Sequence, residues 1–214
     1  MGNFLDLQNK IAFDLRGVNT AAETGFLDQI KSTINQVIDS LSGKMFWFNC
    51  RVSYTSTNPN QPLAEYYSLP VDYKALICDP ALVDPTDNSR VVLSRVTNND
   101  IDLMNGRKNK DKPKFYTIIS DQLRLAAVPN RVYTILINYI MKIPPLVNDT
   151  DTNVWLSEAE DLIRFRSDQR LAILPLRNSR LASELSPFIN EAMNVLNEKT
   201  LNWLAIEEII PNDF

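Results

Sequence analysis

The sequence predicts an α+β fold, with helices towards both ends of the chain and a β-rich part between them. Apolar residues repeat at helical spacing in the early and late parts of the chain. The middle instead holds short alternating or β-branched segments separated by turn residues. Pro144 and Pro145, followed by the polar run 148–153, then end the strands, because proline can neither donate to a ladder nor continue a helix.

Composition and charge exclude several classes of protein. The chain has 214 residues, of which 44% are hydrophobic and 22% charged, as is ordinary for a globular protein. This length suits either one domain with a real core or a compact core with a sizeable inserted lobe, and we favour the second. The net charge of −4 disfavours a protein that holds nucleic acid by bulk positive charge, although a local basic patch stays possible. The N-terminus lacks a secretory signal, and no apolar run is long enough to span a bilayer, so we expect no membrane partner.

Two helices are predicted in the first part of the chain. Residues 4–15 place apolar side chains on one helix face, and we expect Gly17 to stop this helix. Residues 20–23, from Thr20 to Glu23, have capping-box spacing for a second helix. Its apolar stripe runs through Phe26, Leu27, Ile30, Ile34, Val37, Ile38 and Leu41, and Gly43 closes it.

The β-rich middle follows the aromatic run 45–49, which we interpret as a buried connector. One short helix is expected within it, from Thr97 to near Gly106, and residues 79–89 are expected to form a loop. Because the connections are short, we expect antiparallel meanders rather than βαβ units. The predicted strands are 50–55, 72–78, 90–96, 115–120, 122–128 and 132–142, with a turn at 120–121.

The return to helices is predicted within residues 152–165. Ser157 and Glu160 have the spacing of a capping box, so we expect the helix to start there. Trp155, just before that cap, and Trp47 are expected to pack at the joint between the helical and β-rich parts.

The remaining helical pattern is marked by two prolines. Pro175 is expected to kink or end one helix, and Pro187 lies either in the first turn of the next helix or at a kink. Apolar positions repeat at helical spacing from Leu181 to Trp203. The tail 205–214 keeps Ile209, Ile210 and Phe214, which suggests that it meets a partner.

No group for covalent or phosphate chemistry is evident. The chain has no histidine, which excludes Ser-His and Cys-His catalysis, and it lacks glycine-rich phosphate loops. Cys50 and Cys78 are interpreted as buried reduced thiols in preference to a disulfide. The acids at 158, 160 and 161 can be drawn as a metal cluster, but acids also favour a helix start, which is the interpretation we prefer. We therefore expect no enzyme activity, catalytic residue, cofactor or metal.

Basic residues gather at two places. The first cluster is Arg107, Lys108, Lys110, Lys112 and Lys114. We interpret it as a solvated turn, while a DNA or channel contact, a subunit contact, or an alternative role as a nucleic-acid-binding module stays open. The second is a series of arginines on the late helices, either paired with Asp161 and Asp168 or facing a neighbouring subunit or DNA. Its members are Arg164, Arg166, Arg170, Arg177 and Arg180.

The order of these features resembles the head-to-tail adaptor (connector) proteins of short-tailed bacteriophages. The resemblance lies in an early helix leading into an aromatic Trp-Phe-Asn, a Tyr-x-Leu-Pro turn, a Tyr-(x)4-Pro-Pro-Leu strand exit, and a Thr-Asn-x-Trp-Leu segment before a helix. It covers nearly the whole chain. The matching residues are Trp47, Phe48, Asn49, Tyr67, Leu69, Pro70, Tyr139, Pro144, Pro145, Leu146, Thr152, Asn153, Trp155 and Leu156.

The resemblance implies a bundle of N- and C-terminal helices that carries an inserted antiparallel β domain. The corresponding ranges are 1–44 and 151–204 for the bundle, 45–150 for the β-rich domain, and 205–214 for an extended tail. It also implies a structural virion protein at the head–tail junction, assembled in the host cytoplasm. Copies would form a homo-oligomeric ring, a dodecamer, below the portal protein. The ring would extend the DNA channel without sequence-specific binding and would dock tail nozzle or tail fibre proteins, with Ile209, Ile210 and Phe214 reaching the portal.

Overall fold

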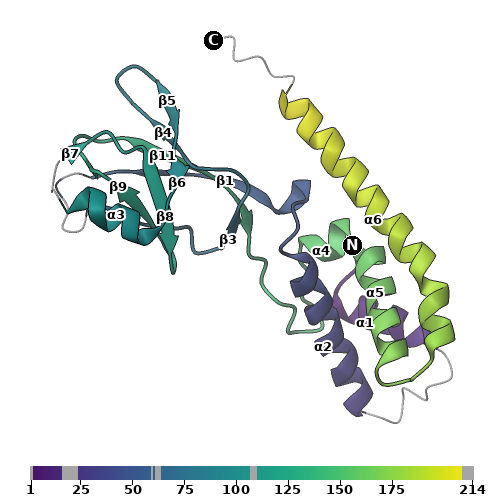
Figure 1. Ribbon diagram of the computed structural model, residues 1–214. Coiled ribbons are helices and arrows are strands. Elements are labelled where there is room, and N and C mark those ends of the chain that lie inside the picture. Colours follow the sequence, from purple (N-terminus) through teal and green to yellow (C-terminus); the bar gives the residue numbers. More distant parts are fainter. Residues whose placement is uncertain (1, 16–23, 59, 61–63, 107–109, 209–214) are drawn as a thin grey trace. The chain divides into compact units, whose positions relative to one another are not determined.

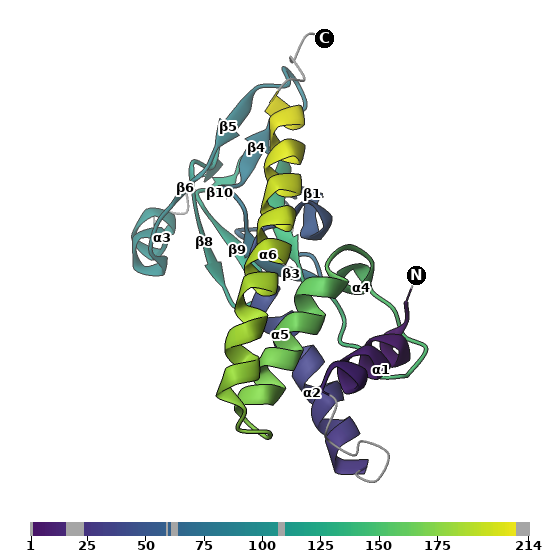
Figure 2. The ribbon, with the colours of Figure 1, turned by 90° about the vertical axis from the view of Figure 1, so that its right-hand side faces the viewer.

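In a computed structural model, which describes residues 2–15, 24–58, 60, 64–106 and 110–208, the chain divides into two compact units (Figures 1 and 2). Met1–Asn49 and Lys142–Phe214 form one unit, here called the helical unit. Cys50–Met141 form the other, the β unit. Both ends of the chain thus contribute to the helical unit, and the predicted α+β class is confirmed.

The helical unit is built from five helices and a short 3-10 turn among the described residues. Asn3 caps the first of them, because its side chain accepts from the Asp6 N–H at 2.9 Å while Asp6 accepts from the Asn3 N–H at 3.0 Å. The elements are α1 (Phe4–Asp14), α2 (Thr24–Leu41), η1 (Trp47–Asn49), α4 (Val154–Glu158), α5 (Glu160–Ile173) and α6 (Ser179–Glu208).

The two predicted early helices are confirmed. Phe4, Leu7 and Ile11 of α1 are fully buried. In α2 the predicted stripe is buried, with the exception of Leu27, which is 39% exposed. Gly17 and the predicted capping box at Thr20–Glu23 lie outside the described residues.

The predicted capping box at Ser157 and Glu160 is wrong. Helix α4 already begins at Val154, where the Asn153 side chain accepts from the N–H groups of Trp155 and Leu156 at 3.1 and 3.2 Å. The Ser157 hydroxyl instead donates to the Val154 carbonyl, and no side chain caps the start of α5. Both asparagine and serine are common N-cap residues. The helix begins after Asn153 because the Asn153 side chain lies within hydrogen-bonding distance of free backbone N–H groups, whereas that of Ser157 does not cap α5.

Helices α5 and α6 lie side by side in Figures 1 and 2. Helix α5 ends at Ile173, before Pro175 as predicted. Pro187, however, lies inside the 30-residue α6 rather than in its first turn. Gln169 helps to join the two helices, because its amide donates to the Ala182 carbonyl and the Ser186 hydroxyl, both at 3.0 Å.

Aromatic side chains fill the core of the helical unit. Trp155 is fully buried, and its ring meets Phe46 and Phe48 edge to face, with centroids 5.6 and 4.9 Å apart. Phe46 and Phe48 also stack on each other at 5.5 Å. Trp155 therefore belongs to α4, inside the helix rather than before its cap, and links the connector 45–49 to the late helices.

A charged cluster joins α1 to α5. The Arg164 guanidinium donates two hydrogen bonds to the Asp14 carboxylate, at 2.5 and 2.7 Å. Asp168, one helical turn after Arg164, is 1% exposed, and neither of its oxygens has a hydrogen-bond donor. Burial and the neighbouring Asp14 carboxylate raise the pKa of Asp168 to about 8. A protonated Asp168 suits this position, because a neutral carboxyl adds no negative charge beside Asp14.

Among its described residues, the β unit contains one helix, α3 (Asn98–Asn105), capped by Thr97 as predicted. Its largest sheet has five strands, and β11 is central in it, with β1 along one side and β3 and β4 along the other. The strands are β1 (Cys50–Ser56), β2 (Tyr66–Ser68), β3 (Tyr73–Leu76), β4 (Ala81–Val83), β5 (Arg90–Val92), β6 (Ser94–Arg95), β7 (Lys110–Asp111), β8 (Phe115–Ile119), β9 (Gln122–Ala126), β10 (Val128–Pro129) and β11 (Thr134–Met141).

The segment 90–96, predicted as one strand, serves two sheets. Its first part, β5, pairs with β4 in the five-stranded sheet, whereas β6 pairs with β8 in the four-stranded sheet. Leu93 lies at the switch point and is fully buried. Strand β4 lies in the region 79–89, so the prediction of a loop there is wrong for residues 81–83.

Most strand pairs are antiparallel, as expected, but two short pairs are parallel. These are β6 with β8 and β10 with β7. Because α3 lies between β6 and β8 in the sequence, these elements form a βαβ unit, which the length of the connections had led us to exclude. The Ser120–Asp121 turn between β8 and β9 is confirmed, with Ser120 at φ 53°.

Neither cysteine forms a disulfide, as predicted, but neither is buried, so the burial part of that prediction is wrong. Cys50 is half-buried at the start of β1. Cys78 is exposed and accepts a hydrogen bond from the Asn138 amide. Across the described ranges, no helix is both long and apolar enough to cross a membrane.

Replacing Trp155 with alanine should lower the free energy of unfolding of the helical unit by about 3–5 kcal/mol, because the substitution leaves a cavity among Phe46 and Phe48. Urea unfolding followed by circular dichroism at a helical wavelength measures this loss. Trp47→Ala is the control, since Trp47 is only half-buried and should cost less. Equal losses in the two variants would contradict the central position of Trp155.

The buried carboxyl of Asp168 should make the helical unit less stable as the pH rises. The unfolded chain loses this proton near pH 4 and the folded chain only near pH 8, so stability falls between these values and is constant above them. Asp168→Asn should flatten this dependence and raise the melting temperature at pH 8. Thermal unfolding from pH 4 to 8 tests it, with the exposed Asp28→Asn as control. An unchanged pH dependence in Asp168→Asn would contradict the assignment.

Candidate functional site

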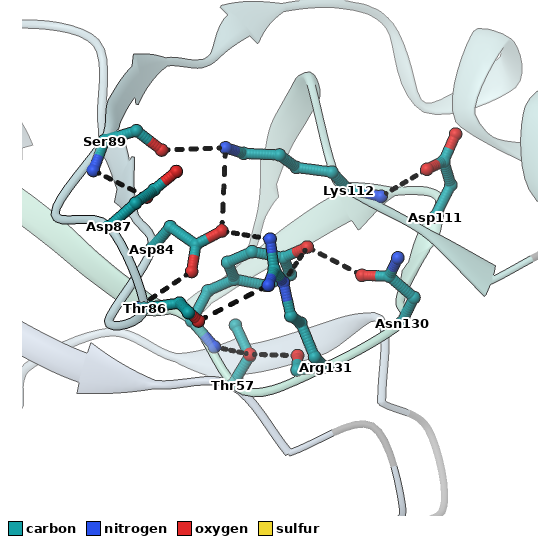
Figure 3. A network of polar contacts seen from close by, with 10 residues as sticks. Thr57, Asp84, Thr86, Asp87, Ser89, Asp111, Lys112, Asn130 and Arg131 are labelled. Carbon is teal, nitrogen blue, oxygen red and sulfur yellow. Dashed lines mark hydrogen bonds and ion pairs between the residues drawn. The ribbon is translucent and has the colours of Figure 1, made fainter.

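Two features of the described residues bear on the predicted sites: a polar network in the β unit, which includes Lys112 of the predicted basic cluster, and a groove on the helical unit. The network is centred on Asp84, whose side chain is fully buried at the end of β4 (Figure 3). Asp84 forms ion pairs with Arg131 and Lys112, the latter at 3.9 Å, and accepts from the Thr86 N–H at 3.1 Å. Lys112 also donates to the Ser89 hydroxyl at 3.3 Å. Two cationic side chains, from segments that are distant in the sequence, thus contact one buried carboxylate.

Tyr133 forms the floor of this network. Its ring lies 5.3 Å from the Arg131 guanidinium and 5.9 Å from the Lys112 ammonium. Its hydroxyl accepts from Arg131 at 3.1 Å and donates to Asn130 at 2.6 Å. The hydrogen bond to Tyr133 and the charge of Asp84 raise the pKa of Arg131, so the guanidinium stays charged. The Thr57 hydroxyl accepts from the Tyr133 N–H at 2.8 Å and so fixes the backbone beneath the ring.

The network changes how the predicted basic cluster is understood. The Lys112 ammonium points towards Asp84, and it shares the single negative charge of that carboxylate with Arg131. Lys110 and Lys114 are exposed, and Arg107 and Lys108 lie outside the described residues. The structure therefore brings one member of the cluster into an internal ion pair instead of presenting it to a phosphate backbone.

The groove runs between α5 and α6 on the helical unit and has a volume of about 590 Å³. Its floor is apolar, and the rings of Phe165 and Phe188 meet there with centroids 5.5 Å apart. Phe188 is 51% exposed, and Val195, about two helical turns later, is 46% exposed. The other apolar residues that line the groove are Leu156, Ala159, Leu162, Ala192 and Leu196.

The rim of the groove is acidic. Glu158, Asp161 and Glu191 line it, and none of the ion pairs among the described residues includes them. Two lysines also line the rim: Lys10 pairs with Glu160, and the Lys199 ammonium, which keeps its charge, lies 5.3 Å from the centre of the Trp47 ring. The four acids outnumber these two lysines. The uncompensated charge of the rim is therefore negative.

The late arginines have different surroundings from one another. Arg164 pairs with Asp14, not with the predicted partners Asp161 and Asp168. Arg180 pairs with Glu184 along α6 at 2.9 Å. Arg170 and Arg177 are exposed near the turn that joins α5 to α6. Sequence patterns on a single helix could not find the Asp14 contact, because α1 and α5 are far apart in the chain.

The remaining predicted site residues are placed as follows. Trp47 and Trp155 both belong to the helical unit, where Phe48 contacts each of them. Their packing at the joint between the units stays a prediction. Ile209, Ile210 and Phe214 lie outside the described residues. Glu158, Glu160 and Asp161 do not converge on a metal position, and the described part of the chain contains no group of three such ligands.

Comparison with known proteins identifies the family. The family model described as SU10 adaptor protein matches residues 2–173 of the 214. The chain belongs to the SU10 adaptor protein family. This match confirms the resemblance to phage adaptors, and the protein is a structural phage adaptor protein.

The matched range covers the β unit and the helical unit through α5, and α6 lies beyond it. One side of the groove therefore belongs to the matched part of this SU10 adaptor protein and the other side to α6. Among curated proteins, no relative matches the chain.

Asp84→Ala should destabilise the β unit by about 1–3 kcal/mol, because Arg131 and Lys112 would lose the buried carboxylate that they share. Lys112→Ala should cost less than about 1 kcal/mol, since Arg131 still pairs with Asp84. Hydrogen exchange of the amides in β4 and β11 measures both effects. Similar protection in wild type and Asp84→Ala would contradict the structural role of the network.

Proposed function

We propose that this adaptor protein forms a ring, a dodecamer, below the portal protein at the junction of the phage head and tail. The observation that carries the proposal is the family match over residues 2–173. Copies in such a ring bury surface on their neighbours, and the exposed apolar residues of α6 are suited to burial. The ring would assemble in the host cytoplasm and become part of the virion.

We further propose that the ring extends the DNA channel and offers tail nozzle or tail fibre proteins a docking surface. The charge balance supports this role, because a wall with many free cations would hold the phosphates of passing DNA. The net charge is −4, and Lys112 is paired internally with Asp84. The wall would therefore not hold the DNA through its phosphates, and we propose that the DNA passes without sequence-specific binding.

The tail residues Ile209, Ile210 and Phe214 are proposed to bind the portal. They provide apolar side chains at the end of a polar and acidic segment, and apolar anchors of this kind supply much of the affinity of an interface.

Mixing the protein with the portal protein of its own phage should yield a complex that contains about twelve copies of the chain, as the proposed symmetry requires. Native mass spectrometry and electron microscopy of the mixture measure the stoichiometry and the position of the ring. Absence of any portal complex, or a location away from the portal, would contradict the proposal.

The triple variant Ile209→Asp, Ile210→Asp and Phe214→Asp should weaken portal binding by about 100-fold or more, because three apolar anchors would carry charges that resist burial. Asn212→Ser in the same tail is the control and should bind as wild type does. Surface plasmon resonance on immobilised portal measures both. Unchanged affinity of the triple variant would remove the portal role of the tail.

A further inference from the structure

The turn that joins α5 to α6 exposes an unusual combination of side chains. Ile173 is 52% exposed and Leu174 is 67% exposed, and they are adjacent in the chain. Arg170 and Arg177 lie beside them and are also exposed, and neither takes part in an ion pair within the described residues. The turn therefore exposes two apolar side chains beside two cations that have no ion-pair partner among the described residues, and Arg170 and Leu174 also line a pocket beside α2. An apolar and acidic surface would suit this combination.

Backbone hydrogen bonds hold this turn in one conformation. The Leu176 N–H donates to the Leu171 carbonyl at 3.2 Å, and the Asn178 N–H donates to the Ala172 carbonyl at 2.8 Å. The Asn178 side chain then caps α6 by accepting from the Leu181 N–H at 3.1 Å. Because the turn is already ordered, its binding to a partner loses little conformational entropy.

The groove between α5 and α6 has the complementary chemistry. Its floor exposes Phe188 and Val195, and its rim carries Glu158, Asp161 and Glu191 without ion-pair partners among the described residues. Two cations and an apolar tip on the turn thus correspond to three anions and an apolar floor in the groove. A partner with a phosphate backbone would be repelled by the acidic rim, whereas the turn satisfies both the charge and the apolar surface.

One chain cannot place its own turn in its own groove. The groove residue Asp161 and the turn residue Ile173 lie on the same helix α5. Their separation of twelve residues corresponds to about 18 Å along a straight helix. The occupant must therefore be the turn of another molecule.

We propose that a second copy of this chain inserts its α5–α6 turn, with Ile173, Leu174, Arg170 and Arg177, into the acid-rimmed groove of its neighbour. The contact is heterologous, because the surfaces on the two copies differ, and repeating it closes a ring when the rotation between copies is suitable. This inference rests on the ring proposed above and assigns the surfaces through which its subunits bind each other. The turn anchors the interface, and neighbouring helix surfaces supply the remaining area that a stable interface needs.

Charge reversal tests the contact directly. Glu191→Arg and Arg177→Glu should each reduce the fraction of chain in rings by at least about tenfold, because an attractive pair becomes a repulsive one. The chain with both reversals should recover assembly, since the pair is restored with opposite signs. The measurement is sedimentation velocity of the full chain, alone and with the portal protein of its own phage. Glu198→Arg is the matched control, because Glu198 is exposed on α6 but does not line the groove.

The outcomes separate this inference from the proposed function. The contact is supported if the single variants lose their rings, the double variant recovers them and the control keeps them. Normal rings in both single variants overturn the contact and leave the adaptor ring standing. Absence of rings in wild type, with and without the portal, overturns both. Circular dichroism of each variant verifies that the exposed substitutions leave the helices folded.

A crosslinking experiment tests the same pair of surfaces without altering charge. In a background of Cys50→Ser and Cys78→Ser, chains carrying Val195→Cys are mixed with chains carrying Leu174→Cys and oxidised. Mixed disulfide dimers should form at least about tenfold faster than with Asn197→Cys in place of Val195→Cys, because a preformed contact raises the local thiol concentration. Asn197 is exposed on α6 but faces away from Val195 and does not line the groove. Equal rates for the two mixtures would overturn the contact.

Discussion

The antiparallel pairing of β1 with β11 is the constraint on which the rest of the architecture depends. Its register places Cys50 opposite Ile140, so the chain enters and leaves the β unit at adjacent positions. Segments that are about a hundred residues apart in sequence can then share one core, in which Trp155 meets Phe46 and Phe48. Without this pairing, the early and late helices would each expose an apolar face that neither could bury alone.

This arrangement suits a structural role. The β unit holds internal polar networks such as the one around Asp84, and both units expose apolar side chains, those of the helical unit including residues of α6 and of the α5–α6 turn. Contiguous exposed apolar surface commonly marks an interaction site. In such a role, the charge and the shape of the exposed surfaces determine which of them bind each other.

Prediction from sequence succeeded where a single segment carries enough information. The stripe from Phe26 to Leu41 predicts α2 because helical spacing alone selects the buried face, and Thr97 predicts α3 because its partner Asp100 lies three residues away. It failed where two local solutions compete, as with Asn153 and Ser157 for the start of a helix. It also failed for β4, whose three residues are a strand only because β11 and β5 lie on either side of them.

The sequence by itself determined the class of fold, the faces of the long helices and the family, since these depend on spacing and on the order of motifs along the chain. Tertiary structure alone decided the partners of the charged groups. Arg164 meets Asp14 and Lys112 meets Asp84 because the fold brings distant segments within a few ångströms, where burial strengthens each ion pair. For the same reason, some cations form internal ion pairs while those at the α5–α6 turn stay exposed. The fold decides which groups lie beside a charge, and residue spacing along the chain does not predict this.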